Sequence, residues 1–320
     1  MEKQITFTDI EYTARRKPTK REIFLEQMNA LIPWEDCVSM IEPYYPSGSR
    51  GRPPRAIEQM LRMLLLQSWF NLSDEGIEDA IYDSYAMKDF MGIDFGNGEQ
   101  VPDATTLCKF RKLLTQHGLQ KKFFDLVQKI LKDSGKEVTG GTIVDATIIE
   151  ASSSRKNKEK KPDPEMHSTR KGTKWYYGMR LHTKVDPVHG FVQGVAVTPA
   201  NEAEVKVAAS MLHSDDSVVY GDAGYCKLER YTKDGISRSY RINRQRGTFI
   251  RHYGDSLSWQ EEKKLEQRKS SVRCKVEYAF HIVKDIFHWR KVRYRGIAKN
   301  TAVAYLLCAS ANIYMLATMG

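Results

Sequence analysis

The sequence predicts an α/β fold, a mixed sheet flanked by helices, preceded by an all-helical N-terminal domain. Apolar residues recur with the helical period through the first third of the chain, whereas runs of β-branched residues begin after residue 141. Paired glycines in KEVTGG, residues 136–141, separate these two patterns. We therefore place the domain boundary there and expect domains at residues 1–135 and 136–320.

The first domain shows several helix starts. Thr19 opens a capping box, which begins the first helix, and a loop rich in proline and glycine follows that helix. Residues 55–70 carry apolar side chains at helical spacing, which predicts an amphipathic helix with one face toward a core. Ser73 begins a further helix, and Asp103 begins one that ends at Gly118.

The second domain is expected to contain elements in the order β-β-β-α-β, followed by a long helix. Their predicted ranges are 142–149, 175–185, 191–197, 201–212, 217–220 and 260–287. Residues 223–260 contain the irregular stretch that precedes the long helix. The lysine-rich stretch 152–174 lacks apolar residues that could pack, so it is either a solvated loop or a mobile basic arm that contacts phosphates.

Composition indicates which class of partner the protein binds and in which cellular compartment it acts. A net charge of +10 and a pI near 9.2 favour a polyanionic partner such as nucleic acid. The 5 cysteines lack Cys-x-x-Cys spacing, which argues against a disulfide framework or a zinc finger and favours a reducing, cytoplasmic location. The N-terminal residues do not resemble a secretory signal, and the uncharged stretch 302–319 is expected to be a buried closing helix rather than a membrane span.

A carboxylate interrupts the first predicted strand. Asp145 lies in GTIVDATIIE, which otherwise looks like a strand buried on both faces. A buried carboxylate costs several kcal/mol unless it is paired, hydrogen-bonded or bound to a metal ion, so this position is either a defect or a site.

Two further acids extend the pattern. Asp222 follows the short strand in SVVYGDAGY, where it is either a site residue at the carboxyl end of a strand or a turn residue before Gly224. On the long helix, the spacing of Arg273, Glu277 and Lys284 places them on one face, although the first two could be an ordinary surface ion pair.

Together, two acids on strands and one on a later helix suit cations that prefer oxygen ligands. Mg²⁺ binds carboxylates together with waters and substrate phosphates, and Mn²⁺ can replace it. Two such ions can drive in-line displacement at a phosphodiester by activating a water or a 3′-hydroxyl and stabilising the leaving oxygen. We therefore predict that Asp145, Asp222 and Glu277 are both metal ligands and catalytic residues.

Nearly the whole chain resembles the DDE transposases of bacterial insertion sequences, specifically the group named after insertion sequence five. The resemblance is carried by RGRPPRAIEQMLRMLLLQSWFNLSDEGIEDAIYD (50–83), TIVDATIIEASSS (142–154), VVYGDAGY (218–225) and VRYRGIAKNTA (292–302). The Tyr-Arg-Glu-Lys signature of the group maps onto Arg273, Glu277 and Lys284, with Ser270 at the tyrosine position. The resemblance implies a ribonuclease-H-like catalytic domain, a helical DNA-binding domain, and a homo-oligomer, expected to be a dimer, on paired transposon ends.

Residues outside the acids are predicted to contact double-stranded DNA. Strand alternation places three polar residues on one sheet face, directed either toward the cleft and DNA or toward solvent, and His182 among them is a candidate helper near the scissile phosphate. A basic loop resembling a minor-groove arm, a recognition helix after Asp103 and a basic, aromatic stretch after the long helix are the other candidates. With Arg273 and Lys284, the predicted set is Arg180, His182, Lys184, Arg50, Arg52, Thr105, Thr106, Lys109, Arg290, Lys291, Arg293 and Arg295.

Three functions remain open from the sequence. The first is a transposase that binds terminal inverted repeats, cleaves there with two metal ions and joins the 3′-hydroxyl ends to target DNA. The second is a DNA-binding protein that has lost catalysis, which the intact acids argue against. The third is a nuclease without strand joining.

Overall fold

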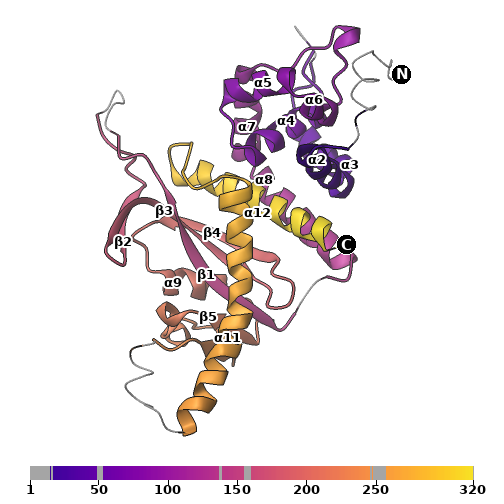
Figure 1. Cartoon of the computed structure of the whole chain (residues 1–320). Helices are drawn as coiled ribbons and strands as arrows, with labels where there is room; N and C mark the ends of the chain where they lie inside the picture. The colour runs from indigo at the N-terminus through magenta and orange to yellow at the C-terminus, as the bar shows by residue number, and fades with distance from the viewer. Residues whose placement is uncertain are drawn as a thin grey trace. The chain divides into compact units, whose positions relative to one another are not determined.

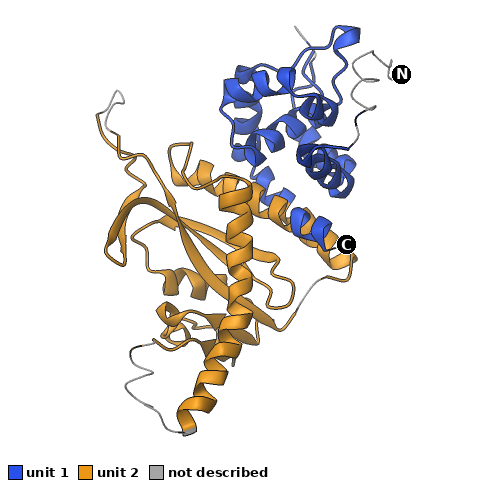
Figure 2. Ribbon diagram, in the orientation of Figure 1, with its two compact units in different colours: residues 1–123, 313–320 blue, residues 124–312 orange. Residues whose placement is uncertain are grey.

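The computed structural model describes residues 15, 17–48, 53–136, 139–154, 160–245, 247 and 257–319. The chain divides into two compact units, which Figure 2 shows in different colours. Unit 1 comprises residues 1–123 and 313–320, and unit 2 comprises residues 124–312. The division falls within helix α8, Leu119–Asp133.

Unit 1 is helical, and its predicted helix starts are confirmed. Thr19 forms the capping box, the Ser73 hydroxyl accepts from the backbone N–H of Gly76, and the Asp103 carboxylate accepts from that of Thr106. Each cap satisfies a backbone donor that has no partner within the helix. The helices are α2 (Lys20–Leu31), α3 (Trp34–Ile41), α4 (Ile57–Trp69), α5 (Asp74–Asp83), α6 (Tyr85–Met91) and α7 (Ala104–Gln116).

The predicted apolar face of α4 packs into the core, where Met60 and Leu64 are buried. The prediction of a loop after α2 is wrong in part, because residues 34–41 form α3. Pro33 stands immediately before α3, where a missing N–H costs nothing, so this proline begins a helix instead of breaking one.

Unit 2 contains a mixed sheet, as predicted. Its strands are β1 (Gly141–Glu150), β2 (His167–Lys171), β3 (Lys174–Val185), β4 (Val192–Pro199), β5 (Val218–Gly221) and β6 (Ser239–Ile242). Strand order is β2-β3-β1-β5-β6, and β4, which is off this path, pairs with β3. Pairing is antiparallel among β1 to β4 and parallel from β1 to β5 and from β5 to β6.

Two strands lie in segments that were predicted to be irregular. Residues 167–171 of the basic stretch pair with β3 as β2, and residues 239–242 pair with β5 as β6. Both are short strands at the ends of the sheet order, so partner strands and not their own apolar pattern specify them.

Helices cover both faces of the sheet. Helix α11 (Leu257–His281) contacts β1, β3 and β5, and Figure 1 shows it crossing the strands. Helix α9 (Glu204–Met211) contacts β1, β3 and β4, and its Ala208 packs against Val144 of β1. Side chains of neighbouring strand residues point to opposite faces, so Asp145 points to the other face, toward α11.

Helix α12, Ile297–Thr318, is the one helix in the described ranges that is long and apolar enough to cross a membrane. Of its most apolar window, 56% is buried inside the protein, as in the core helix of a soluble protein. Asn312 is fully buried and both donates to and accepts from the backbone of Val192. Nothing in the described residues points to a membrane protein.

Candidate active site

Adjacent parallel strands bring the first two acids together. Ile143 of β1 is in register with Tyr220 of β5, so Asp145 and Asp222 each lie two residues further along neighbouring strands. Asp222 directly follows the end of β5, and its Oδ1 accepts from the backbone N–H of Gly224 at 2.8 Å. Asp222 is therefore a turn residue and also a neighbour of Asp145.

Helix α11 brings the third acid to the same place through an arginine. One guanidinium nitrogen of Arg273 lies 3.5 Å from Oδ2 of Asp145, and the other lies 3.0 Å from Oε1 of Glu277. Arg273 and Glu277 form the i, i+4 ion pair considered from the sequence, and Arg273 also contacts Asp145 on β1. The Glu277 side chain is 60% exposed, whereas that of Asp145 is only 15% exposed.

The surroundings of Asp145 contain more negative than positive charge. Burial raises the pKa of Asp145 to about 6, and the carboxylates of Asp222 and Glu204 also act to raise it. The backbone N–H of Ala146 and the guanidinium of Arg273 act in the opposite direction but do not cancel this rise. Residues 145–148 are only partly buried, unlike residues 141–144 before them, so the carboxyl is within reach of solvent.

These acids fit a divalent cation in charge and in ligand chemistry. Within the described ranges, no three His, Cys, Asp or Glu residues are grouped so that they could hold a metal ion as they stand. The donor set is nevertheless all carboxylate, which suits Mg²⁺ or Mn²⁺. The guanidinium of Arg273 lies beside Asp145 but does not cancel the effect of burial, which raises the pKa of that carboxyl.

Lys284 extends the site along β1. Its Nζ donates to Oγ1 of Thr147 at 2.6 Å, and Thr147 shares the sheet face of Asp145. Burial, then the charges of Lys171 and Arg290, lower the pKa of Lys284. Lys284 lies in a π-helical turn, Ile282–Ile286, that continues α11, and such turns are frequent at functional sites. Arg273 and Lys284 therefore both contact β1, and Glu277 is linked to it through Arg273.

The predicted polar face of β3 does not look toward the acids. Asp145 is paired with Thr183, whereas His182 is paired with Ala146, so His182 points to the opposite face. His182 is 2% exposed, and burial, with the charge of Arg180, lowers its pKa to about 4. This corrects the expectation that His182 stands beside the scissile phosphate.

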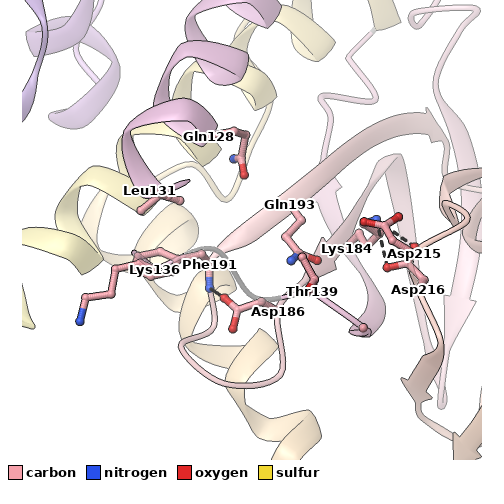
Figure 3. A pocket seen from close by; sticks show the side chains of 11 residues that line it. Gln128, Leu131, Lys136, Thr139, Lys184, Asp186, Phe191, Gln193, Asp215 and Asp216 are labelled. Atoms are coloured by element: carbon pink, nitrogen blue, oxygen red, sulfur yellow. Dashed lines mark hydrogen bonds and ion pairs between the residues drawn. The ribbon is translucent and has the colours of Figure 1, made fainter. Parts of the chain in front are cut away.

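Lys184 is also buried, at 5% exposure, on that opposite face. Its ammonium pairs with the buried carboxylate of Asp216 at 2.9 Å, beside a pocket that Asp186 and Gln193 also line (Figure 3). The prediction that Lys184 contacts DNA is therefore corrected, because the ammonium is already paired inside the protein. No sequence pattern linked these two residues, which are far apart in the chain.

Glu204 is a carboxylate that the sequence interpretation did not consider. It begins α9, and its Oε1 lies 3.2 Å from a guanidinium nitrogen of Arg180. Arg180 also donates to the backbone carbonyl of Glu202 and to Thr169, which leaves its guanidinium held by the protein. The Glu204 carboxylate acts to raise the pKa of Asp145, but its partner Arg180 lies on the same face of β3 as His182, opposite Asp145. The only sequence feature that marked Glu204 was its position as an acid in the first turn of a helix.

The remaining predicted DNA contacts differ in exposure. On α7, Thr105 and Lys109 are exposed, while Thr106 is half-buried and its hydroxyl donates to Asp103. Trp289, considered for base stacking, is 4% exposed and belongs to the core. Arg50 and Arg52 lie outside the described residues. The cations after α11 are all exposed: Arg290, Lys291, Arg293 and Arg295.

Two family profiles match the chain. A family profile described as Transposase DDE domain matches residues 136–313, more than half of the chain. A second profile, described as Transposase domain (DUF772), matches residues 12–113. No solved structure matches the chain. The chain therefore belongs to the DDE transposase family, a class of enzymes that act on DNA and depend on divalent metal ions.

Proposed function

We propose that the chain is the transposase of an insertion sequence of the insertion sequence five group. It binds terminal inverted repeats, cleaves phosphodiester bonds there and joins the 3′-hydroxyl ends to target DNA. The observation that carries this proposal is the meeting of Asp145, Asp222 and the Arg273–Glu277 pair, which come from β1, the end of β5 and α11. Acids on two central strands and a later helix also support a ribonuclease-H-like catalytic domain.

Asp145, Asp222 and Glu277 are the residues that would hold the metal ions. When bound, two Mg²⁺ ions, or Mn²⁺ in their place, supply activation of the attacking oxygen and stabilisation of the leaving oxygen. Arg273 holds the Asp145 and Glu277 carboxylates in place before the ions arrive. Lys284, oriented by Thr147, offers an ammonium to a phosphate of the bound strand beside the acids.

The helical domain, residues 1–135, is proposed to recognise the repeats, with the exposed Thr105 and Lys109 of α7 reading or flanking the bases. A homodimer would bring two ends together. The net charge of +10 supports binding to polyanionic DNA, and the protein would act in the cytoplasm on the nucleoid.

The test is cleavage and joining of labelled DNA that carries the inverted repeats flanking the gene, with Mg²⁺ or Mn²⁺. Wild type is expected to cut at the repeat boundary and to leave scrambled DNA intact. Glu277→Gln keeps the side chain's shape but removes a charge, so it should bind the repeats and cut them at least about 100-fold more slowly. Glu261→Gln, the same change at an exposed position of α11, is the control and should cut normally.

The other outcomes separate the alternatives. Binding to repeats without cleavage by wild type would indicate a DNA-binding protein that has lost catalysis. Cleavage without joined products would indicate a nuclease. Equal cutting by wild type and Glu277→Gln would reduce Glu277 to a partner of Arg273 and contradict the three-carboxylate site.

A further inference from the structure

The guanidinium of Arg273 bridges two of the three acids that would hold the metal ions. One of its nitrogens lies 3.5 Å from Oδ2 of Asp145, and another lies 3.0 Å from Oε1 of Glu277. Among the described residues, these two carboxylates are its only polar partners. The other oxygen of Asp145, Oδ1, accepts from the backbone N–H of Ala146 at 2.8 Å. Both carboxylates therefore have one oxygen already paired with the same cation.

A guanidinium in this position competes with a divalent cation. Mg²⁺ or Mn²⁺ would bind the same carboxylate oxygens, and two cations held close together in a partly buried site repel each other. As they stand, the acids in the described part of the chain are not grouped so that they could hold a metal ion. Arg273 therefore has to leave Asp145 before an ion takes its place there.

The side chain of Arg273 is placed so that it can move to a new anion. It is 23% exposed, and its partner Glu277 is 60% exposed, so the guanidinium can turn toward solvent while α11 stays in place. Lys284 is not the competing cation, because its ammonium is held by Oγ1 of Thr147 at 2.6 Å. A guanidinium that leaves a carboxylate suits a DNA phosphate, which it binds through two parallel hydrogen bonds.

We propose that Arg273 is a gate that couples metal binding to DNA binding. Without DNA, its guanidinium holds Asp145 and Glu277 and lowers their affinity for divalent ions. When the repeat DNA binds, a phosphate draws the guanidinium away, and the carboxylates become available to the ions. The protein then has its full metal affinity only on its own DNA, which limits cleavage of other phosphodiesters. This inference rests on the proposed function, since it assigns a regulation to the same acids.

The test is titration of full-length proteins with Mn²⁺, measured by the electron paramagnetic resonance signal of the free ion, with and without repeat DNA. Without DNA, Arg273→Gln is expected to bind Mn²⁺ about tenfold more tightly than wild type, a usual size for coupling between two ligands. With DNA, and with the DNA alone as baseline, the two proteins should bind Mn²⁺ equally. Arg273→Lys keeps the charge, but one ammonium holds two carboxylates less well than a guanidinium, so its DNA-free affinity should lie between the two. Arg268→Gln, at an exposed position of α11, is the control and should match wild type.

Two results would overturn the inference. One is an Arg273→Gln protein that, without DNA, binds Mn²⁺ no more tightly than wild type, because Arg273 would then only hold the carboxylates in place. The other is an equal gain in affinity with and without DNA, because the guanidinium would then stay beside the acids. Either result leaves the proposed function intact as long as wild type still selects and cuts the repeats. If Asp145→Asn binds Mn²⁺ as wild type does, the ions bind elsewhere, and that result contradicts the proposed function instead.

Discussion

Asp145→Asn is expected to abolish strand cleavage and, without divalent metal, to make the protein more stable at pH 8. The loss of cleavage should reach about 1,000-fold, because the substitution removes the most central of the three carboxylates from the site. The gain in stability has a separate cause. The folded protein holds this carboxyl among other carboxylates, and burial raises its pKa from 3.8 to about 6.

The sign of this pH effect follows from proton binding. Between pH 3.8 and about 6 the folded state binds the Asp145 proton more tightly than the unfolded state, so the free energy of unfolding falls as pH rises through that window. Above pH 6 the full cost of holding the ionised Asp145 carboxyl in the folded protein is present, and it lowers the free energy of unfolding by about 3 kcal/mol at most. The Asn variant has no such carboxyl, so its stability should change less between pH 4 and pH 7.

Urea unfolding at several pH values measures this difference. Mg²⁺ should raise the melting temperature of wild type above pH 6 and leave that of Asp145→Asn nearly unchanged, because the ion lowers the cost of the charge. Asp79→Asn, at an exposed position of α5, is the control for the substitution itself. A variant that is inactive but no more stable than wild type would show that Asp145 is well compensated without metal.

Periodicity was sufficient for the central elements of the fold. The strands around Asp145 and Asp222 and the helix carrying Glu277 have strong apolar patterns of their own, because they are buried against other elements. Strand β2, HSTRK, has no apolar residue and forms through its pairing with β3. Such strands depend on tertiary contacts that a local pattern does not contain.

The prediction of the site began where a residue's type conflicts with its expected environment. A carboxylate in an apolar strand conflicts with burial, and that conflict is enough to identify Asp145 as a candidate site residue from the sequence. Alternation along β3 correctly placed His182 and Lys184 on one face, but it contains no information about which face receives α11. Only the register, with Asp145 opposite Thr183, determines this, and the register depends on residues distant in sequence.

Lys184→Met is expected to destabilise the protein by about 3–5 kcal/mol and to leave the salt dependence of DNA binding unchanged. Asp216 is only 4% exposed, and the substitution removes the cation that pairs with its carboxylate. A buried charge without a partner is costly. Asp216 would keep only the backbone N–H of His213, which lies 2.7 Å from its Oδ2. Urea unfolding at pH 7 measures the change, with Lys206→Met at an exposed position of α9 as the control.

A second substitution separates the cost of the unpaired charge from the loss of packing. Adding Asp216→Leu to Lys184→Met removes both charges, and this pair of changes should restore most of the lost stability, because apolar residues of similar volume often replace a buried ion pair without cost. If Lys184→Met instead unfolds like wild type and binds DNA more weakly, with a shallower salt slope, the ammonium must leave Asp216 to reach a phosphate. The DNA contact predicted from the alternation of β3 would then be correct, and the buried ion pair would be a resting state of the DNA-free protein.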